Sequence, residues 1–209
     1  MRKKPLQKRS RETVDALIEA TARTIAERGL VETTTNHIAA RAGVGIGSLY
    51  EYFSDKEELV DALLDRVIVE LSQVVDRELA RVMAADARTA TRRLLTAVFD
   101  FMERDESCHL ELVRHWQQTP STRTIEVLER HMLEACRQYL LRHQEEIGVR
   151  DLPAALYVVI SSTIYTVVHY LSQPQPFLSR TQVIDALSEM ISAYLHATPA
   201  PSRRKAKRR

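Results

Sequence analysis

Apolar residues recur every three to four positions along most of this 209-residue chain. That spacing is typical of amphipathic helices, because one helical turn takes about 3.6 residues. It predicts nine helices, at about residues 11–28, 35–42, 46–53, 55–83, 87–104, 108–118, 122–146, 153–173 and 180–196. Glycine and proline are rare, at 5 and 7 residues, and Ala, Leu, Glu and Arg dominate. The composition therefore also favours an all-α fold.

Capping residues and prolines mark several helix ends. Ser54 is expected to cap the fourth helix, with Glu57 three residues later completing a capping box. Pro153 suits the first turn of the eighth helix, where its missing N–H costs nothing. The stretch 174–176 holds two prolines and separates the eighth helix from the ninth.

The two shortest predicted helices, 35–42 and 46–53, are joined by a tight turn at Gly43. Thr35 is expected to cap the first of them, and Gly43 to take the left-handed conformation that ends it. Helices of eight residues are unstable alone, so they need support from the preceding helix, 11–28. This arrangement describes a helix-turn-helix, whose second helix enters a DNA major groove.

The residues of this region closely resemble the DNA-binding domain of TetR-family transcriptional regulators. The resemblance rests on IAARAGV (residues 38–44) and GSLYEYFSDK (residues 47–56), and it covers roughly residues 10–60. One position departs from the family, because Gly45 stands where Ser or Thr commonly caps the recognition helix.

The resemblance implies an all-α protein built of an N-terminal three-helix DNA-binding domain and a C-terminal helical domain for ligand binding and dimerisation. The expected limits are a disordered basic arm at 1–9, the helix-turn-helix domain at 10–54, the helical domain at 55–197 and a disordered basic tail at 198–209.

Carried over position by position, the resemblance implies two kinds of DNA contact. Base edges would be met by Ile46, Gly47 and Ser48, since the recognition helix begins there. Phosphates would be met by Thr35, Tyr50, Tyr52 and Lys56, with His37 and Arg41 as further candidates. Leu49 and Phe53 are interpreted as core residues that hold the recognition helix in place.

The net charge of +2 conceals an uneven distribution. Residues 1–11 carry six bases and no acid, and residues 203–209 carry six more bases. Removing these twelve leaves 18 bases against 28 acids, so the middle of the chain has a net charge of about −10. Basic arms of this kind usually meet nucleic acid. For the C-terminal run, a solvated tail that aids solubility explains the composition equally well.

The cysteines and the first residues indicate a cytoplasmic protein. Cys108 and Cys136 have no CxxC spacing, and we interpret them as reduced core residues, with a disulfide as the alternative. No apolar segment follows the basic first residues, so no signal peptide is expected.

A long uncharged segment, residues 152–179, raises the question of a membrane span. Residues 152–171 are long enough to cross a bilayer. This stretch holds eight Ser, Thr, Tyr and His residues, however, and its flanks lack the Lys/Arg asymmetry that orients a span. Burial against the chain's own domain on one side and a second subunit on the other explains it as well. No membrane partner is therefore expected.

The last helix carries an apolar stripe wider than one partner helix requires. The stripe predicts that the last two helices form a four-helix interface in a homodimer, as the resembled family does. The alternative is burial within one subunit. The candidate interface residues are Val183, Ile184, Leu187, Met190, Ile191 and Tyr194. A dimer would read a palindromic operator in double-stranded DNA with two recognition helices.

The resemblance also implies a small-molecule effector held within the fourth to eighth helices. Candidate pocket residues are the large apolar and aromatic side chains there, with one histidine: Phe99, Met102, Trp116, Tyr139, Tyr157, Tyr165 and His169. His109 and His115 lie near Cys108, but a separation of six residues places the two imidazoles on different sides of a helix. No metal and no cofactor are therefore expected.

Three classes of function can be compared with these features of the sequence. An enzyme is disfavoured, because the chain has no GxSxG, P-loop or HExxH motif. A nonspecific architectural nucleic-acid-binding protein would explain the basic ends but not the long helical domain. A repressor released from its operator by a small apolar or aromatic ligand explains the features together. Regulators that activate, or that act without a ligand, remain open alternatives.

Overall fold

A computed structural model describes residues 8–104, 106–116 and 122–196, and the side chains of residues 10–104, 108–114 and 126–196. These ranges contain nine α-helices and no strand, which confirms the all-α prediction. The predicted arm (1–9) and tail (198–209) lie almost wholly outside the described residues. The helices are α1 (Lys8–Glu32), α2 (Thr35–Ala42), α3 (Ile46–Tyr52), α4 (Lys56–Val82), α5 (Ala87–Glu103), α6 (Glu106–Trp116), α7 (Thr122–Arg142), α8 (Leu152–Ser172) and α9 (Arg180–Leu195).

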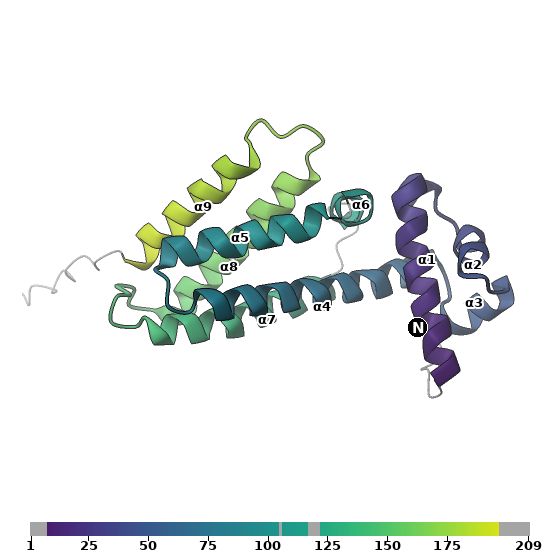
Figure 1. Ribbon diagram of the computed structural model, residues 1–209, viewed down its shortest axis with the longest axis horizontal. Coiled ribbons are helices and arrows are strands. Elements are labelled where there is room, and N and C mark those ends of the chain that lie inside the picture. The colour runs from purple at the N-terminus through teal and green to yellow at the C-terminus, as the bar shows by residue number, and fades with distance from the viewer. Residues whose placement is uncertain (1–7, 105, 117–121, 197–209) are drawn as a thin grey trace, which may run out of the picture.

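The helices form two parts joined by α4 (Figure 1). At one end, α2 and α3 pack on α1, as the prediction of a three-helix unit requires. From there α4 runs for 27 residues, about 40 Å, into a bundle with α5 and α7. Helix α9 lies against α5, and α8 packs on α6 and α7. Helix α6 also lies against α1, so both α4 and α6 connect the two parts.

The apolar core is continuous across the predicted boundary between residues 54 and 55. One cluster of buried residues includes Leu17 of α1, Ile38 of α2, Leu49 of α3 and Leu59 of α4, and it extends to Phe99 in the bundle. A second cluster fills the far end of the bundle, around the end of α4. The three-helix unit and the base of α4 therefore share one core, and a movement of α4 is felt by the helices that pack on it.

Two predicted caps are displaced by one residue. Thr34, not Thr35, caps α2, because the Thr34 hydroxyl accepts a hydrogen bond from His37 N. Asp55, not Ser54, caps α4 by accepting a hydrogen bond from Glu58 N at 2.8 Å. In both places two neighbouring side chains are good caps, and the tertiary path of the chain decides which one is used.

Helix α1 is interrupted near its end, where the prediction also stops the first helix. Gly29 has φ 74° and ψ 163°, a conformation that only glycine adopts readily. The following turn is held by the Thr33 hydroxyl, which donates to the Gly29 carbonyl at 2.8 Å. This break directs the chain from α1 into α2.

Candidate nucleic-acid interface and ligand cavity

The turn between α2 and α3 has the geometry that the sequence predicts. Gly43 is left-handed, with φ 67° and ψ 27°. Its N–H donates to the Ala40 carbonyl at 3.3 Å, and Val44 N–H donates to the Ala39 carbonyl at 3.1 Å. These two bonds close the end of α2, and Val44 packs against the core. The angle between α2 and α3 is therefore fixed by local contacts.

Helix α3 presents one side to solvent and the other to the core. Leu49 and Phe53 are fully buried, which confirms their interpretation as core residues. Ile46, Gly47 and Ser48, in the first turn, are exposed. The helix begins at Gly45, whose carbonyl accepts from Ser48 N at 2.9 Å, and no side chain caps it. The first turn of α3 is thus available to a partner.

Two of the predicted phosphate-contacting residues meet at the edge of this surface. The Thr35 hydroxyl lies 3.1 Å from the Tyr50 hydroxyl, within hydrogen-bonding distance, and Tyr50 is exposed. Tyr52 differs, because its side chain belongs to the core and only 8% of the residue is exposed. Tyr52 therefore offers a phosphate much less surface than Tyr50 does.

The basic candidates are already engaged within the protein. Lys56, the first residue of α4, donates from Nζ to the Leu30 carbonyl at 3.2 Å. Arg41 pairs with Glu27 of α1. These contacts hold both side chains close to the helix-turn-helix. The Glu27 carboxylate offsets the charge of Arg41, whereas the Leu30 carbonyl leaves the charge of Lys56 in place.

The three-helix unit is acidic once the arm is set aside. Residues 11–58 carry five bases and nine acids. Within the same unit Arg23 pairs with Glu19 at 3.0 Å, so a further base is neutralised. The exposed turn of α3 itself carries no charge, and readout there would depend on shape, apolar contacts and a hydroxyl.

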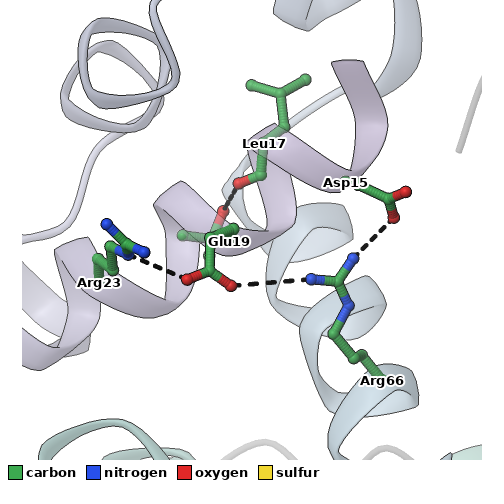
Figure 2. Close-up of polar contacts among 6 residues, drawn as sticks. Asp15, Leu17, Glu19, Arg23 and Arg66 are labelled. Carbon is green, nitrogen blue, oxygen red and sulfur yellow. Dashed lines mark hydrogen bonds and ion pairs between the residues drawn. The ribbon is translucent and has the colours of Figure 1, made fainter. Parts of the chain in front are cut away.

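Polar contacts also tie α4 to α1. Figure 2 shows Arg66 of α4 between two carboxylates of α1. Its Nη2 donates to Asp15 Oδ1 at 2.7 Å, and its Nη1 lies 4.0 Å from Glu19 Oε2. Glu19 in turn accepts from Arg23. Arg66 therefore links the helix that lines the bundle to the helix that supports the recognition helix.

Helix α6 makes the second connection. Cys108 and Leu112 are buried in the same core cluster as the α1 residues Leu17 and Ile25. A Cβ atom added to Gly29, at the break of α1, would lie 3.8 Å from Glu111 Oε2. Helix α6 thus contacts α1 at its break.

A cavity of about 230 Å³ lies inside the bundle, between α4, α5, α6, α7, α8 and α9. Its described lining is almost entirely aliphatic, and none of the described lining residues carries a formal charge. Representative lining residues are Leu64, Leu71, Leu95, Met102, Leu112, Met132, Leu156, Ile160, Ile164 and Leu171. Both α4 and α6, which contact α1, contribute to its wall.

Only part of the predicted pocket is confirmed as cavity lining. Met102 and Tyr139 line the cavity. Phe99 is fully buried but packs edge-on against Tyr170 at 5.5 Å, outside the described lining. The side chain of Trp116 lies outside the described residues.

Three predicted pocket residues of α8 are corrected by the structure. Tyr157 and Tyr165 are 64% and 70% exposed, and His169 stacks on Tyr165 at the surface. Helix α8 is apolar on nearly every side, so its sequence gives no sign of which face points inward. These three residues lie on its outer face.

The polar lining residues were not predicted. They are Thr91, His109, Cys136 and Thr163, with Tyr139 as the predicted exception. Burial raises the pKa of the Cys136 thiol to about 11. Burial also raises the pKa of Tyr139 to about 12, and its hydroxyl donates to the Ala85 carbonyl at 2.6 Å. His109 could have been found from the sequence, because it lies beside predicted core positions, but the sequence analysis considers it only as a metal ligand.

The His, Cys, Asp and Glu side chains of the described residues are not clustered. No group of three His, Cys, Asp or Glu side chains there could hold a metal ion. Neither Cys108 nor Cys136 forms a disulfide, so the alternative of a bridge between them is not realised.

The predicted dimer interface is corrected in four of its six residues. Val183, Ile184, Leu187 and Ile191 are buried within the protomer, where α9 packs against α5. Arginines of α5 and α9 reinforce this packing, for example Arg88 with Glu189 at 2.5 Å. Sequence periodicity showed the apolar stripe of α9 but not that α5 covers it.

The exposed apolar residues of the last two helices lie elsewhere on their surfaces. Met190 and Tyr194 are 48% and 40% exposed on α9, and Tyr157, Val158 and Tyr165 are exposed on α8. Helix α8 is long and apolar enough to cross a membrane, yet only 28% of its apolar window is buried. A helix buried wholly in its own domain would be covered more completely, so the described residues leave the outer face of α8 uncovered.

Comparison with known proteins identifies the N-terminal unit. The family described as "Bacterial regulatory proteins, tetR family" matches residues 17–63. The HTH-type transcriptional regulator BetI of Paraburkholderia xenovorans (strain LB400) is 38% identical over 84 residues, which are 40% of this chain and 43% of that protein. BetI of Burkholderia mallei (strain NCTC 10229) is 33% identical over 115 residues, 54% of this chain and 58% of that protein. The match thus spans less than two thirds of the length of these curated relatives.

Solved structures extend the likeness of fold to most of the chain. A putative TetR-family transcriptional regulator from Mesorhizobium loti MAFF303099 has a TM-score of 0.67 at 17% identity, covering 90% of this chain and 98% of that chain. SmeT, the repressor of the Stenotrophomonas maltophilia multidrug efflux pump SmeDEF, has a TM-score of 0.63 at 19% identity, covering 91% and 97%. Residues 17–63 therefore match the family of tetR-type bacterial regulatory proteins, and most of the chain shares its fold with the two solved structures.

Proposed function

We propose that this protein is a cytoplasmic transcriptional repressor that binds a palindromic operator as a homodimer and leaves it when a small apolar ligand binds. The observation that carries the proposal is the first turn of α3. Ile46, Gly47 and Ser48 are exposed there, while Leu49 on the opposite side is fully buried. The beginning of the second helix is the part of a helix-turn-helix that meets base edges.

The exposed turn suits a short set of base contacts. The Ile46 side chain can pack on a thymine methyl group, and the Ser48 hydroxyl can donate to or accept from several bases. Gly47 lets the backbone approach the bases, since nothing lies within 4 Å of the position where its Cβ would be. Together these residues give modest discrimination, which a second recognition helix would multiply.

Phosphate contacts would flank this turn. The Thr35 and Tyr50 hydroxyls lie together at 3.1 Å and can share one phosphate. Lys56 opens α4, so its charge and the positive end of the helix dipole act at the same place. These groups would position α3 without reading sequence.

The outer face of α8 and α9 is proposed as the dimer interface, with a second copy of the chain as its partner. Its apolar members are Tyr157, Val158, Tyr165, Met190 and Tyr194, all exposed in the protomer. Exposed apolar residues concentrated on two neighbouring helices mark interaction sites. Pairing them with their copies would form a four-helix interface and set the spacing of the two recognition helices.

Ligand release would follow from the position of the cavity. Its wall includes α4 and α6, the two bundle helices that contact α1. A ligand that displaces either helix would shift α1 and its attached α3, and so change the spacing of the two recognition helices. By linkage, the ligand must then bind the free protein more tightly than the operator complex, by the same factor by which it weakens DNA binding.

The test begins with a duplex selected by the purified protein from a random library. The proposal expects a palindromic consensus that stays bound at a salt concentration that releases random DNA. Ser48→Ala should change the relative affinity for variants of that duplex by about 1–3 kcal/mol at one position of each half-site. Tyr50→Phe should weaken binding to selected and scrambled duplexes alike. A selection that yields no consensus would favour the architectural alternative and refute the proposal.

A further inference from the structure

We infer that the bundle cavity binds an uncharged, extended aliphatic molecule of roughly nine carbons that carries one terminal hydroxyl, and that His109 accepts the hydrogen bond from this hydroxyl. A medium-chain primary alcohol is the simplest member of this class. The inference rests on the proposed function in one respect, since it takes the cavity to be the effector site. It names the chemistry of the effector, which the fold leaves open.

The size of the cavity sets the size of the ligand. An apolar cavity of about 150 Å³ holds benzene, which has six carbons. In proportion, about 230 Å³ accommodates roughly nine carbons. A ligand much larger than this would have to displace core side chains.

The shape of the cavity favours a chain over a ring system. Its lining residues on α5 run from Ala87 to Met102, which is roughly 22 Å of helix at 1.5 Å per residue. On α8 they run from Ala155 to Leu171, a similar length. A volume of about 230 Å³ drawn out along these helices is narrow. An extended hydrocarbon fits such a space, whereas a fused ring system would be too wide.

The lining excludes a charged ligand. No Asp, Glu, Lys or Arg is among the described residues of the wall. An isolated carboxylate or ammonium group in an apolar interior loses its hydration without gaining a partner, at a cost of many-fold in affinity. A cation would find little compensation from aromatic rings either, because Tyr139 supplies the one phenol or phenyl ring of the described lining.

His109 provides a free acceptor at the wall. Its Nδ1 lies 3.2 Å from the Phe101 carbonyl oxygen, and its ring stacks on the Phe101 ring at 4.9 Å. A carbonyl oxygen only accepts, so Nδ1 must carry the proton in this contact. In the neutral ring Nε2 is then an acceptor, and it has no partner among the described residues. A ligand hydroxyl can donate to it.

Two of the other polar lining groups are already satisfied. The Tyr139 hydroxyl donates to the Ala85 carbonyl, and the Thr163 hydroxyl donates to the Val159 carbonyl at 2.6 Å. The Cys136 thiol is a weak partner at best. Thr91 is the remaining polar group, near the opposite end of α5 from the α6 side of the cavity. It is therefore the competing candidate, which the test must separate from His109.

The test is calorimetric titration of the DNA-free protein with four probes of matched length. These are 1-nonanol, octyl methyl ether, nonanoate and nonylammonium. The ether matches the alcohol in size and lacks its donor. We expect nonanol to bind about five- to tenfold more tightly than the ether, as one neutral hydrogen bond allows. We expect nonanoate and nonylammonium to bind more weakly than the ether.

Variants assign the acceptor. His109→Leu should abolish the preference for nonanol over the ether, and His109→Gln, which restores an acceptor near the position of Nε2, should recover part of it. Thr96→Val is the control and should leave the preference unchanged, because Thr96 of α5 lies outside the described lining and its hydroxyl donates to the Arg92 carbonyl at 2.8 Å. Thermal unfolding followed by circular dichroism shows whether each variant is folded, and the ether affinity shows whether its cavity is intact.

Each other outcome overturns the inference. Absence of binding by any probe, equal affinity for nonanol and the ether, or tight binding of nonanoate would refute the ligand class. Loss of the preference in Thr91→Val but not in His109→Leu would refute the assignment to His109. Because these titrations contain no DNA, a failure of the ligand assignment is distinguishable from a failure of the proposed function. That proposal fails separately, if nonanol binds as inferred but does not release the protein from its selected duplex.

Discussion

The Arg66 guanidinium of α4 donates to the Asp15 carboxylate of α1 at 2.7 Å, across the junction between the bundle and the N-terminal three-helix unit. Both side chains remain partly exposed, at 29% for Arg66 and 68% for Asp15. Exposed ion pairs contribute little to stability, typically about 0–1 kcal/mol. The position of this pair suggests a different role, because it couples the movement of a cavity-lining helix to α1.

Replacing Arg66 with alanine should therefore weaken the coupling between ligand binding and operator binding more than it lowers the stability. We expect the free energy of unfolding to fall by less than about 1 kcal/mol. The ratio of ligand affinities for free and operator-bound protein should fall, because one of the contacts by which α4 carries α1 with it is lost. Calorimetry in the presence and absence of the operator measures this ratio.

Arg23→Ala is the matched control for this prediction. Arg23 pairs with Glu19 at 3.0 Å, and both residues belong to α1, so the pair does not cross the junction. Its loss should leave the affinity ratio unchanged. An equal reduction in both variants would show that the Arg66–Asp15 contact has no special part in coupling.

Buried and exposed residues of α8 and α9 should respond differently to an introduced charge. Leu187→Asp places a carboxylate in the core between α9 and α5, so we expect the protomer to unfold or lose several kcal/mol of stability. Tyr165→Asp changes an exposed residue of α8 and should leave the helices folded while preventing dimerisation. Light scattering and circular dichroism together distinguish the two results.

Val69→Asp serves as the control for a surface charge. Val69 is 56% exposed on α4, away from α8 and α9, so this variant should remain a folded dimer. A folded dimer for Tyr165→Asp as well would mean that the outer face of α8 is not the interface.

The parts of the structure that the sequence predicted well are those determined by local signals. Gly43 ends α2 in the left-handed conformation, which glycine adopts without steric cost because it has no Cβ atom. The burial of Leu49 and Phe53 follows from their spacing on a short helix that must pack on α1. In contrast, the choice between Thr34 and Thr35 as a cap depends on the path of the chain, since either hydroxyl suits that role.

The parts that were predicted wrongly depend on contacts between distant segments. Leu187 was assigned to the dimer interface because periodicity shows that it belongs to an apolar stripe. Periodicity does not show that α5, about 90 residues earlier in the chain, packs on that stripe within the same protomer. Tyr157 and Tyr165 looked like pocket residues because α8 is apolar on nearly every side. Periodicity identifies a buried face, but it does not identify which element buries it.

Two glycines should give opposite effects when replaced by alanine. Gly29 has φ 74°, so an alanine there is strained, and we expect a loss of about 1–2 kcal/mol in the free energy of unfolding. Gly47 lies in α3 without a positive φ and with open space around its Cβ position. Alanine should stabilise that helix by up to about 1 kcal/mol. Urea denaturation measures both changes.

The same two variants separate folding from DNA recognition. Gly47→Ala should weaken binding to the selected duplex despite its greater stability, since the added methyl group lies on the surface proposed to meet the bases. If Gly47→Ala binds DNA as the wild type does, the first turn of α3 does not approach the bases closely. If Gly29→Ala is as stable as the wild type, the break in α1 relaxes without strain.

The N-terminal arm should supply most of the electrostatic attraction to DNA. Residues 11–58 carry five bases against nine acids, and Arg41 is already paired with Glu27. The arm, residues 1–9, carries five bases and no acid. An acidic unit approaches a polyanion only if some other segment reverses the local charge. The arm adjoins the start of α1 and is the nearest basic segment in sequence.

Deleting Arg2, Lys3 and Lys4 should therefore reduce the salt dependence of DNA binding. Each phosphate contact contributes about 0.9 to the slope of log affinity against log salt concentration, so the slope should fall by up to about 2.7 per protomer. Affinity for selected and scrambled duplexes should fall together, because these contacts carry no base information. Deleting residues 203–209, which carry six bases, is the control, since α9 ends at the opposite end of the molecule from α2 and α3 (Figure 1). Fluorescence anisotropy over a salt series measures the slopes, and a slope that depends on the C-terminal deletion alone would show that the tail, and not the arm, meets the DNA.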